Sequence, residues 1–414
     1  MRRVAAFPAC VVASVALAAL LPALLAAPLQ AQSLLSTSGL GVPTPPLDAR
    51  ARALGGVPTG LFGFALSLGN PADAAGILYR GGMASLQPFS RTDEIGGEKA
   101  TTSGARFPLL RVLYPAGRFV ASLGYGGFLD QSWAVTTSGT ERFGNDSASV
   151  TDVVRSAGGI SQLQLGTSYY VSSHLALGAA VGLYTGNTVR QVTRTFPDSA
   201  SANFLGFSSR TQWGFHGPLA SVGARADIAG VLRLAGAATW SGTLRADSSA
   251  GGASPRAYKL PLQAELGTSA ILAPKLTLSA GGSWAGWSRT EFGATGAGNC
   301  GPLGSCLAAP VLSRDTWAVG AGMEYGGTHA GIRTFPFRAG FHYAQLPFYG
   351  SGDVLPSEKS LSLGAGMRVG GSEDSPGAQL DAAIERGSRT GGPSTGPLSE
   401  SFWRLTFSLA VFGR

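Results

Sequence analysis

The chain has little of what enzymes and nucleic-acid-binding proteins use. Only 13% of its 414 residues are charged, four are histidine and three are cysteine. The histidines show no metal-ligand spacing, and the sequence contains no Gly-x-Ser-x-Gly elbow, phosphate-binding loop or Cys-x-x-Cys pair. Basic residues are scattered and form no stripe with aromatic residues, which argues against nucleic-acid binding. We expect no enzyme, no cofactor and no metal site.

Long apolar runs are also missing. After residue 31 there is no stretch of about 18 apolar residues that would form a membrane-spanning helix. Yet the chain is 44% hydrophobic and carries 61 glycines, which long helices tolerate poorly. This combination favours an architecture of many strands.

The N-terminus has the pattern of an export signal. A basic start at residues 1–3 precedes an uncharged stretch over 4–27, and Leu-Gln-Ala at 29–31 ends in a small residue. We expect residues 1–31 to be a signal peptide and Gln32 to begin the mature chain. A retained N-terminal membrane helix is the alternative.

Alternation with a period of two is clearest at the C-terminus. Residues 402–411 present one apolar face and one face that is largely small or polar. The same pattern recurs over 175–183, 317–325 and 361–369, with glycine and alanine prominent on the second face. In the final strand we expect lipid to contact Trp403, Leu405, Phe407, Leu409 and Val411.

About fourteen segments have this character. They lie near 76–89, 105–114, 117–135, 150–171, 174–194, 206–225, 230–245, 256–271, 275–292, 314–326, 332–345, 359–370, 377–388 and 400–413. Short connections such as Ile228-Ala229 alternate with longer ones such as 136–149, as periplasmic turns alternate with outer loops in outer-membrane barrels. The sequence predicts an all-β fold, a transmembrane antiparallel β-barrel of about fourteen strands over residues 76–414.

Residues 32–75 precede the first strand and lack sustained alternation. A segment of this length either trails in the periplasm or folds into the lumen. Because a barrel of about fourteen strands encloses space that has to be filled or gated, we expect an N-terminal hatch in the lumen.

Four groups of residues, in order along most of the mature chain, share a family pattern. They are Ala53-Leu54-Gly55-Gly56-Val57 with Ser67-Leu68-Gly69-Asn70-Pro71-Ala72, Leu260-Pro261 with Leu276-Thr277-Leu278 and Trp287-Ser288, Phe337-Arg338-Ala339-Gly340-Phe341-His342-Tyr343, and Val354-Leu355-Pro356-Ser357. Together they resemble the FadL/TodX-type outer-membrane transporters of long-chain fatty acids and other hydrophobic compounds. The resemblance implies a hatch inside the barrel and a kinked third strand that opens the wall sideways.

Three glycines mark the expected third strand. Gly124, Gly126 and Gly127 interrupt good strand sequence over 119–130. Glycine inside a strand often marks a bulge or kink, which would leave a lateral opening. Alternatively, the small residues let the hatch pack closely against the wall.

The motif Asn70-Pro71-Ala72 is the expected gate. Pro71 fixes its own backbone angle, and the Asn70 side chain can bond neighbouring main chain. We expect this part of the hatch to pack beside the three glycines of the third strand and to shield the opening, because unpaired backbone is costly in lipid.

Cys300 and Cys306 are the only cysteines beyond the signal. An even pair in an oxidising compartment predicts a disulfide, here in an outer loop.

Passive transport of hydrophobic molecules, with binding in the lumen and lateral exit, is the leading functional hypothesis. A general diffusion porin is one alternative, but it would need a wide charged lumen, and the sequence places few charges on the inward faces. A structural or secretion-associated barrel is another, because fold does not fix function. An enzyme with a site assembled from separate strands also stays open. The expected partners are a hydrophobic ligand, outer-membrane lipid with lipopolysaccharide, and the barrel-assembly machinery.

Overall fold

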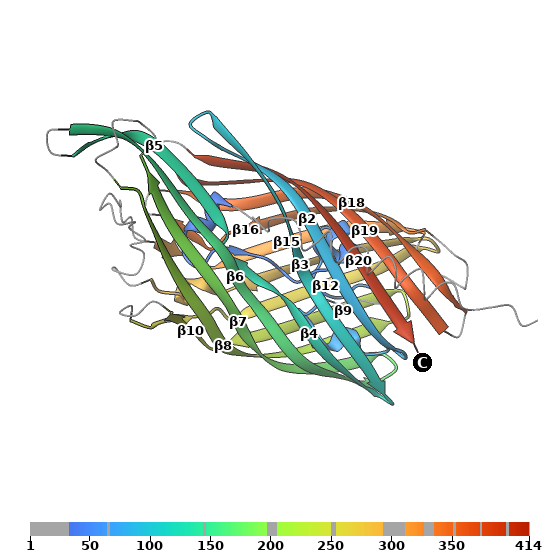
Figure 1. Ribbon diagram of the computed structural model, residues 1–414. Coiled ribbons are helices and arrows are strands. Elements are labelled where there is room, and N and C mark those ends of the chain that lie inside the picture. The colour runs from blue at the N-terminus through green and yellow to red at the C-terminus, as the bar shows by residue number, and fades with distance from the viewer. Residues whose placement is uncertain are drawn as a thin grey trace, which may run out of the picture.

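The chain forms a closed antiparallel β-barrel (Figure 1). The computed structural model describes residues 33–63, 67–143, 146–196, 205–249, 254–292, 311–326, 335–350, 353–372, 375–394 and 397–413. Within these residues fourteen strands follow one another around the barrel, and the last pairs with the first. The predicted fold and strand number are confirmed.

The barrel strands, in order, are β2 (Arg80–Ile95), β3 (Glu98–Ala116), β4 (Phe119–Asp130), β6 (Asp146–Ser172), β7 (Leu175–Thr195), β8 (Phe207–Ile228), β9 (Leu232–Ser241), β12 (Gln263–Ala273), β13 (Leu276–Ala285), β15 (Thr316–Tyr325), β16 (Phe337–Gln345), β18 (Asp353–Ser372), β19 (Ser375–Pro393) and β20 (Leu398–Gly413). Three strands continue barrel strands toward one end, namely β5 (Trp133–Phe143), β10 (Thr243–Ser248) and β11 (Arg256–Lys259). The remaining short elements are η1 (Leu34–Thr37), β1 (Val42–Pro43), α2 (Ala49–Ala53), η2 (Pro71–Ala74), η4 (Trp287–Arg289), β14 (Val311–Ser313) and β17 (Phe348–Gly350).

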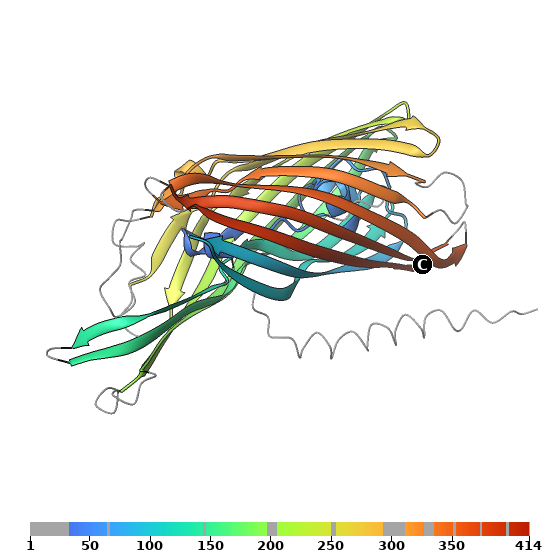
Figure 2. The same cartoon turned by 90° about the horizontal axis from the view of Figure 1, so that it is seen from above.

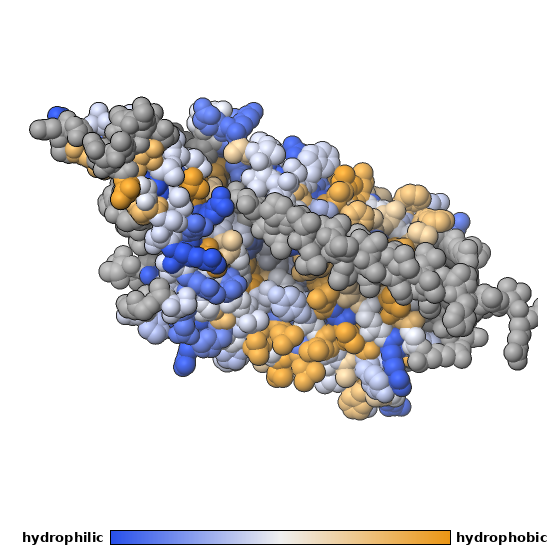
Figure 3. Space-filling view, viewed as in Figure 1, coloured by the Kyte–Doolittle hydropathy of each residue, from blue (hydrophilic) through white to orange (hydrophobic). Residues whose placement is uncertain are grey.

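The final strand shows how alternation divides the barrel into an outer and an inner face. Trp403 and Phe407 are 48% and 47% exposed, whereas Arg404 and Ser408 are 5% and 4% exposed. This confirms the predicted outward face. On the face seen in Figure 3, hydrophobic side chains gather over the body of the barrel, and hydrophilic ones gather toward the end with the projecting hairpins. An apolar outer surface of this kind is the lipid-facing band of an outer-membrane barrel.

The connections also alternate as predicted, with three differences. The short turns lie one or two residues later than expected, as at Ala229 and Gly230, which have φ of 51° and 68°. The loop expected over 136–149 is wrong, because β5 and β6 stay paired from Trp133 to Phe143 as a projecting hairpin (Figure 1). The longer connection expected over 90–104 is wrong for the same reason, because β2 and β3 stay paired as far as Ile95 and Glu98. Beyond the membrane both faces meet water, so the backbone ladder persists while the apolar alternation that marks a strand is lost.

The described residues of the N-terminal segment, 33–63 and 67–79, lie inside the barrel (Figure 2). Its helix α2 contacts β16, β18, β19 and β20, and η2 contacts β6, β7 and β8 on another part of the wall. Asp48 caps α2 by accepting a hydrogen bond from the Ala51 N–H at 2.8 Å. No helix in the described residues is long and apolar enough to cross a membrane. The predicted signal peptide, residues 1–31, lies outside the described residues.

Candidate functional site

The third barrel strand is broken into two parts, β4 and β5, which both pair with β6. The ladder stops after Asp130 and resumes at Trp133, so Gln131 and Ser132 lie outside it. A register shift just before the break makes Phe128 an extra, bulged residue. This strand therefore kinks within the wall, and Phe128 turns its buried side chain into the lumen.

The neighbouring strand β3 follows the third strand only part of the way. It pairs with β4 from Ala116 to Leu109, and its described residues beyond Leu109 pair with β2 alone. Pro108 lies where the two strands separate. Because proline has no N–H, it suits the place where a ladder ends. The wall is thus open between the outer part of β3 and the third strand.

The N-terminal segment takes up hydrogen bonds that β3 leaves free. β1 (Val42–Pro43) pairs with the last two residues of β4, and the Thr44 N–H donates to the Phe128 carbonyl oxygen at 2.8 Å. Farther out, the Ser33 N–H donates to the Ser132 carbonyl oxygen at 2.9 Å. The opening is covered from the lumen side.

The three predicted glycines face this covering segment. The neighbours of Gly124, Gly126 and Gly127 are, in that order, the side chains of Leu68, Pro46 and Thr44. A Cβ atom built on Gly126 would lie 2.5 Å from its neighbour, and one on Gly127 would lie 2.9 Å away. The glycines therefore allow the N-terminal segment to pack closely against the wall. The kink itself lies just beyond them, at the bulge of Phe128 and the break after Asp130.

Asn70, Pro71 and Ala72 lie elsewhere, against β7 and β8. The Asn70 Oδ1 accepts a hydrogen bond from the Ala72 N–H at 2.9 Å, and its Nδ2 donates to the Ala224 carbonyl oxygen of β8 at 3.2 Å. Gly178 of β7 leaves no room for a Cβ atom beside this motif. The expectation that the motif packs beside the third-strand glycines is therefore wrong. Small residues occur on several strands, and the ones that admit Asn70–Ala72 belong to β7 and β8.

A cavity of about 160 Å³ lies between the N-terminal segment and the wall. It borders the kinked strand at Gly127 and Phe128. Its size is similar to that of an engineered apolar cavity of about 150 Å³ that binds benzene. Much of its lining is apolar and comes from Leu47, Leu68, Phe128, Trp287 and Leu346.

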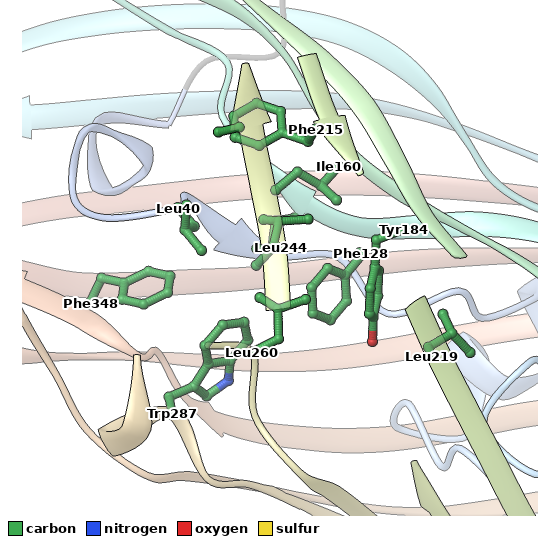
Figure 4. Close-up of a cluster of buried hydrophobic side chains, with 12 residues drawn as sticks. Leu40, Phe128, Ile160, Tyr184, Phe215, Leu219, Leu244, Leu260, Trp287 and Phe348 are labelled. Atoms are coloured by element: carbon green, nitrogen blue, oxygen red, sulfur yellow. The ribbon is translucent and has the colours of Figure 1, made fainter. Parts of the chain in front are cut away.

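Two of these residues, Phe128 and Trp287, extend the apolar lining into a buried aromatic cluster (Figure 4). The ring centroid of Phe128 lies 4.4 Å from that of Tyr184 and 5.9 Å from that of Trp287. Trp287 in turn meets Phe348 edge-on at 5.1 Å, and Leu40 of the N-terminal segment belongs to the same cluster. An apolar molecule in the cavity would meet aromatic surface on this side.

The inward faces carry more charge than the sequence suggested. Arg338 pairs with Glu324 and Asp381, both at 2.6 Å. Glu358 pairs with Arg389 at 2.5 Å and Arg404 at 2.7 Å. The expectation of few inward charges is wrong, because no described strand of this network contributes more than three, as β19 does, and they form a network only when the strands are neighbours.

These charges anchor the N-terminal segment to one side of the barrel. Arg50 of α2 pairs with Glu324 at 2.9 Å, and the Ala49 N–H donates to the Ser408 hydroxyl at 2.8 Å. At its outer end, the Ser33 hydroxyl donates to Glu400 at 2.6 Å. Paired groups thus join the N-terminal segment to this side of the wall.

Two further features complete the site. Cys300 and Cys306 lie outside the described residues, so the disulfide stays a prediction. The part of the chain that the structure describes contains no group of three or more potential metal ligands.

The sequence analysis missed Phe128, Pro108 and the residues of β1. A proline inside an apolar strand was a usable signal for Pro108.

Solved structures of other proteins have a similar fold over nearly the whole length of this chain. A FadL homologue from Pseudomonas aeruginosa is 17% identical with a TM-score of 0.58, covering 90% of this chain and 99% of its own. The toluene transporter TodX from P. putida is 15% identical with a TM-score of 0.54, covering 91% and 99%. The toluene transporter TbuX from Ralstonia pickettii is 18% identical with a TM-score of 0.51, covering 89% and 98%. No family model and no curated protein matches the sequence.

Proposed function

We propose that this barrel, which has the fold of the FadL/TodX-type transporters, carries hydrophobic small molecules passively across the outer membrane. The ligand binds in the lumen and leaves through the side of the wall. The observation that supports this most is the opening between β3 and the third strand, which adjoins the cavity and is covered by the N-terminal segment. In this proposal residues 32–75 act as the hatch.

The covering contacts are weak enough to be exchanged for a ligand. They consist of the short β1 ladder, the Thr44 hydrogen bond and apolar contacts with the glycines. A backbone hydrogen bond contributes about 0.5–1.5 kcal/mol net, so lifting this part of the segment costs on the order of a few kcal/mol. Lifting the segment exposes unpaired backbone groups, which are tolerated where they border a cavity rather than lipid. The route then runs from the cavity, past Phe128, to lipid.

A reversible covalent lock tests this route. A Cβ atom on Gly127 would lie 3.5 Å from the Cβ of Thr44, within the range of about 3.5–4.5 Å that disulfides span. The variant combines Thr44→Cys and Gly127→Cys with Cys300→Ser and Cys306→Ser. We expect the oxidised protein to lose uptake of labelled oleate and toluene into liposomes, and reductant to restore it.

The two single-cysteine variants, treated with the same oxidant, are the matched controls. A cross-linked barrel that transports at the parent's rate would exclude this lateral route. A parent that admits small sugars in a liposome-swelling assay but gives no oleate or toluene uptake would favour the porin alternative. No passage of either class would favour a structural role.

A further inference from the structure

A tryptophan belt marks the outer boundary of the lipid-facing surface. It consists of Trp240 of β9, Trp284 of β13, Trp317 of β15 and Trp403 of β20, each at least 40% exposed. Tryptophan gathers where lipid meets water. On β20 the outward side chains change from apolar to hydroxyl groups beyond Trp403, at Ser401 and Ser399. Ser399 pairs with Glu94 near the tip of the β2–β3 hairpin, so the belt lies toward the outer end of the barrel.

Two cations lie on the outward face at this boundary. Arg386 of β19 pairs directly with Trp403 of β20 and with Leu361 of β18. Directly paired residues point to the same face of a sheet, so Arg386 points outward with Trp403. Lys359 lies two residues beyond Leu361 on β18 and therefore points outward as well. Both cationic side chains are exposed.

The two cations are also close to each other. Lys359 pairs with Ser388, which is two residues from Arg386 on the same strand. Diagonal neighbours of this kind are separated by about 7–8 Å across a sheet, within reach of long side chains. The charged ends of Lys359 and Arg386 can therefore meet at one anionic group.

Neither cation has an anionic partner in the described part of the chain. No carboxylate oxygen there lies within 4.0 Å of the Lys359 ammonium or the Arg386 guanidinium. The carboxylates beside them in sequence, Glu358 and Glu385, point into the lumen, where buried arginines bind them. These strands thus pair their inward charges and leave two outward cations for an anion from outside the barrel.

Aromatic side chains border the two cations. The Arg386 guanidinium lies over the Trp403 ring, 5.1 Å from its centroid, which favours a cation. Tyr343 of β16 pairs with Lys359, and its ring centroid lies 5.0 Å from that of Trp317. Farther into the membrane the wall is apolar. A ligand that fits this surface has an anionic group at the boundary and hydrocarbon below it.

We propose that Lys359 and Arg386 bind a phosphate group of lipopolysaccharide, whose acyl chains lie against the apolar wall of β18, β19 and β20. Lipopolysaccharide forms the outer leaflet and carries phosphate on the sugars directly above its acyl chains, at the level of the tryptophan belt. Phospholipids occupy the periplasmic leaflet, at the other end of the wall. Guanidinium and ammonium groups both form charge-assisted hydrogen bonds with phosphate oxygens. The site is on the outside of the barrel and does not depend on the transport function.

Native mass spectrometry of the purified full-length barrel tests this, in a non-ionic detergent with EDTA to remove divalent cations. The probes are bisphosphorylated lipid A, which is the anchor of lipopolysaccharide, and phosphatidylglycerol, a phospholipid with a single phosphodiester. We expect lipid A to bind the parent more tightly than phosphatidylglycerol. The double variant Lys359→Gln with Arg386→Gln should weaken lipid A binding at least about tenfold.

Lys99→Gln with Arg142→Gln is the matched control, because it removes the same two charges. Both residues are exposed and lie near the tips of the β2–β3 and β5–β6 hairpins, beyond the tryptophan belt. The control should change lipid A binding by about twofold or less, because charges separated by more than a Debye length are screened.

Equal losses in the two double variants would reduce the effect to net charge and overturn the site. Unchanged lipid A binding in the Lys359→Gln and Arg386→Gln variant would overturn it as well, and so would a parent that binds no lipid A. An equal loss for lipid A and phosphatidylglycerol would assign the cations to anionic lipids in general and overturn the assignment to lipopolysaccharide.

Discussion

The N-terminal segment is held differently on the two sides of the barrel. Toward β15 to β20 it is fixed by buried charged groups, such as Arg50 with Glu324 and Ser33 with Glu400. Toward the third strand it is held by a two-residue ladder, by the backbone hydrogen bonds that Thr44 and Ser33 donate, and by van der Waals contact with glycines. Removing one partner of a buried ion pair costs about 3–5 kcal/mol, whereas a neutral hydrogen bond contributes about 1 kcal/mol.

The segment is therefore held strongly on the side of β15 to β20 and weakly on the side of the third strand. A segment held equally on all sides would either stay fixed or leave the lumen altogether. The proposed route requires the part over the opening to move while α2 stays in place, and one strong and one weak side would allow this. The charges of the anchored side are paired with one another, so we expect this side of the lumen to resist polar solutes.

The largest expected effect comes from breaking the anchor. Glu324→Gln leaves Arg50 without a carboxylate and removes one of two partners of Arg338. We expect the free energy of unfolding to fall by about 3–5 kcal/mol in urea titrations in lipid vesicles. Glu141→Gln is the control, because Glu141 is half-exposed and its partner Arg194 keeps Asp152. The control should lose about 1 kcal/mol or less, and equal losses would remove the distinction between the two sides.

A smaller effect is expected from adding one methyl group on each side. In Gly340→Ala the new Cβ atom would meet the backbone of Leu54 and Gly55, which cannot easily move. In Gly124→Ala it would meet only the end of the flexible Leu68 side chain. We expect the first variant to lose about 1–3 kcal/mol and the second clearly less. The same unfolding assay measures both, and the reverse order would contradict a tightly fixed α2.

The smallest effects compare two hydroxyl groups of the segment. Ser33→Ala removes a hydrogen bond to the buried Glu400 carboxylate and should cost about 1–2 kcal/mol. Thr44→Ala removes no side-chain hydrogen bond among the described residues and keeps its backbone bond, so it should change stability by about 0.5 kcal/mol or less. A Thr44→Ala loss as large as that of Ser33→Ala would mean that the edge over the opening is not the weaker side.

Most of the barrel could be predicted from sequence because the membrane imposes a rule on every strand. Lipid on one side and a packed lumen on the other force alternation, as between Phe407 and Ser408. The rule ends where the strands leave the membrane. The hairpin of β5 and β6 was therefore predicted as a loop, although its backbone pairing continues to Phe143.

The site could be predicted only in part, because its parts meet across long sequence separations. The glycines at 124, 126 and 127 were recognisable as small residues in a strand. Which segment they admit depends on the path of the N-terminal chain through the lumen, and no local pattern records that path. The charged groups have the same limitation. Glu324 and Arg338 look like two isolated inward polar residues until β15 and β16 place them opposite each other.

The bond between Ser33 and Glu400 joins residues separated by 367 positions, and it bears on the order of assembly. The N-terminal segment is synthesised first, yet the strands that hold α2 and Ser33 are among the last. The segment can therefore find its final partners only when β18, β19 and β20 are in place, and β20 is also the strand that closes the barrel on β2. Contacts this distant in sequence form slowly. Damage to the final strand therefore removes both the pairing that closes the barrel and a set of contacts that hold the N-terminal segment.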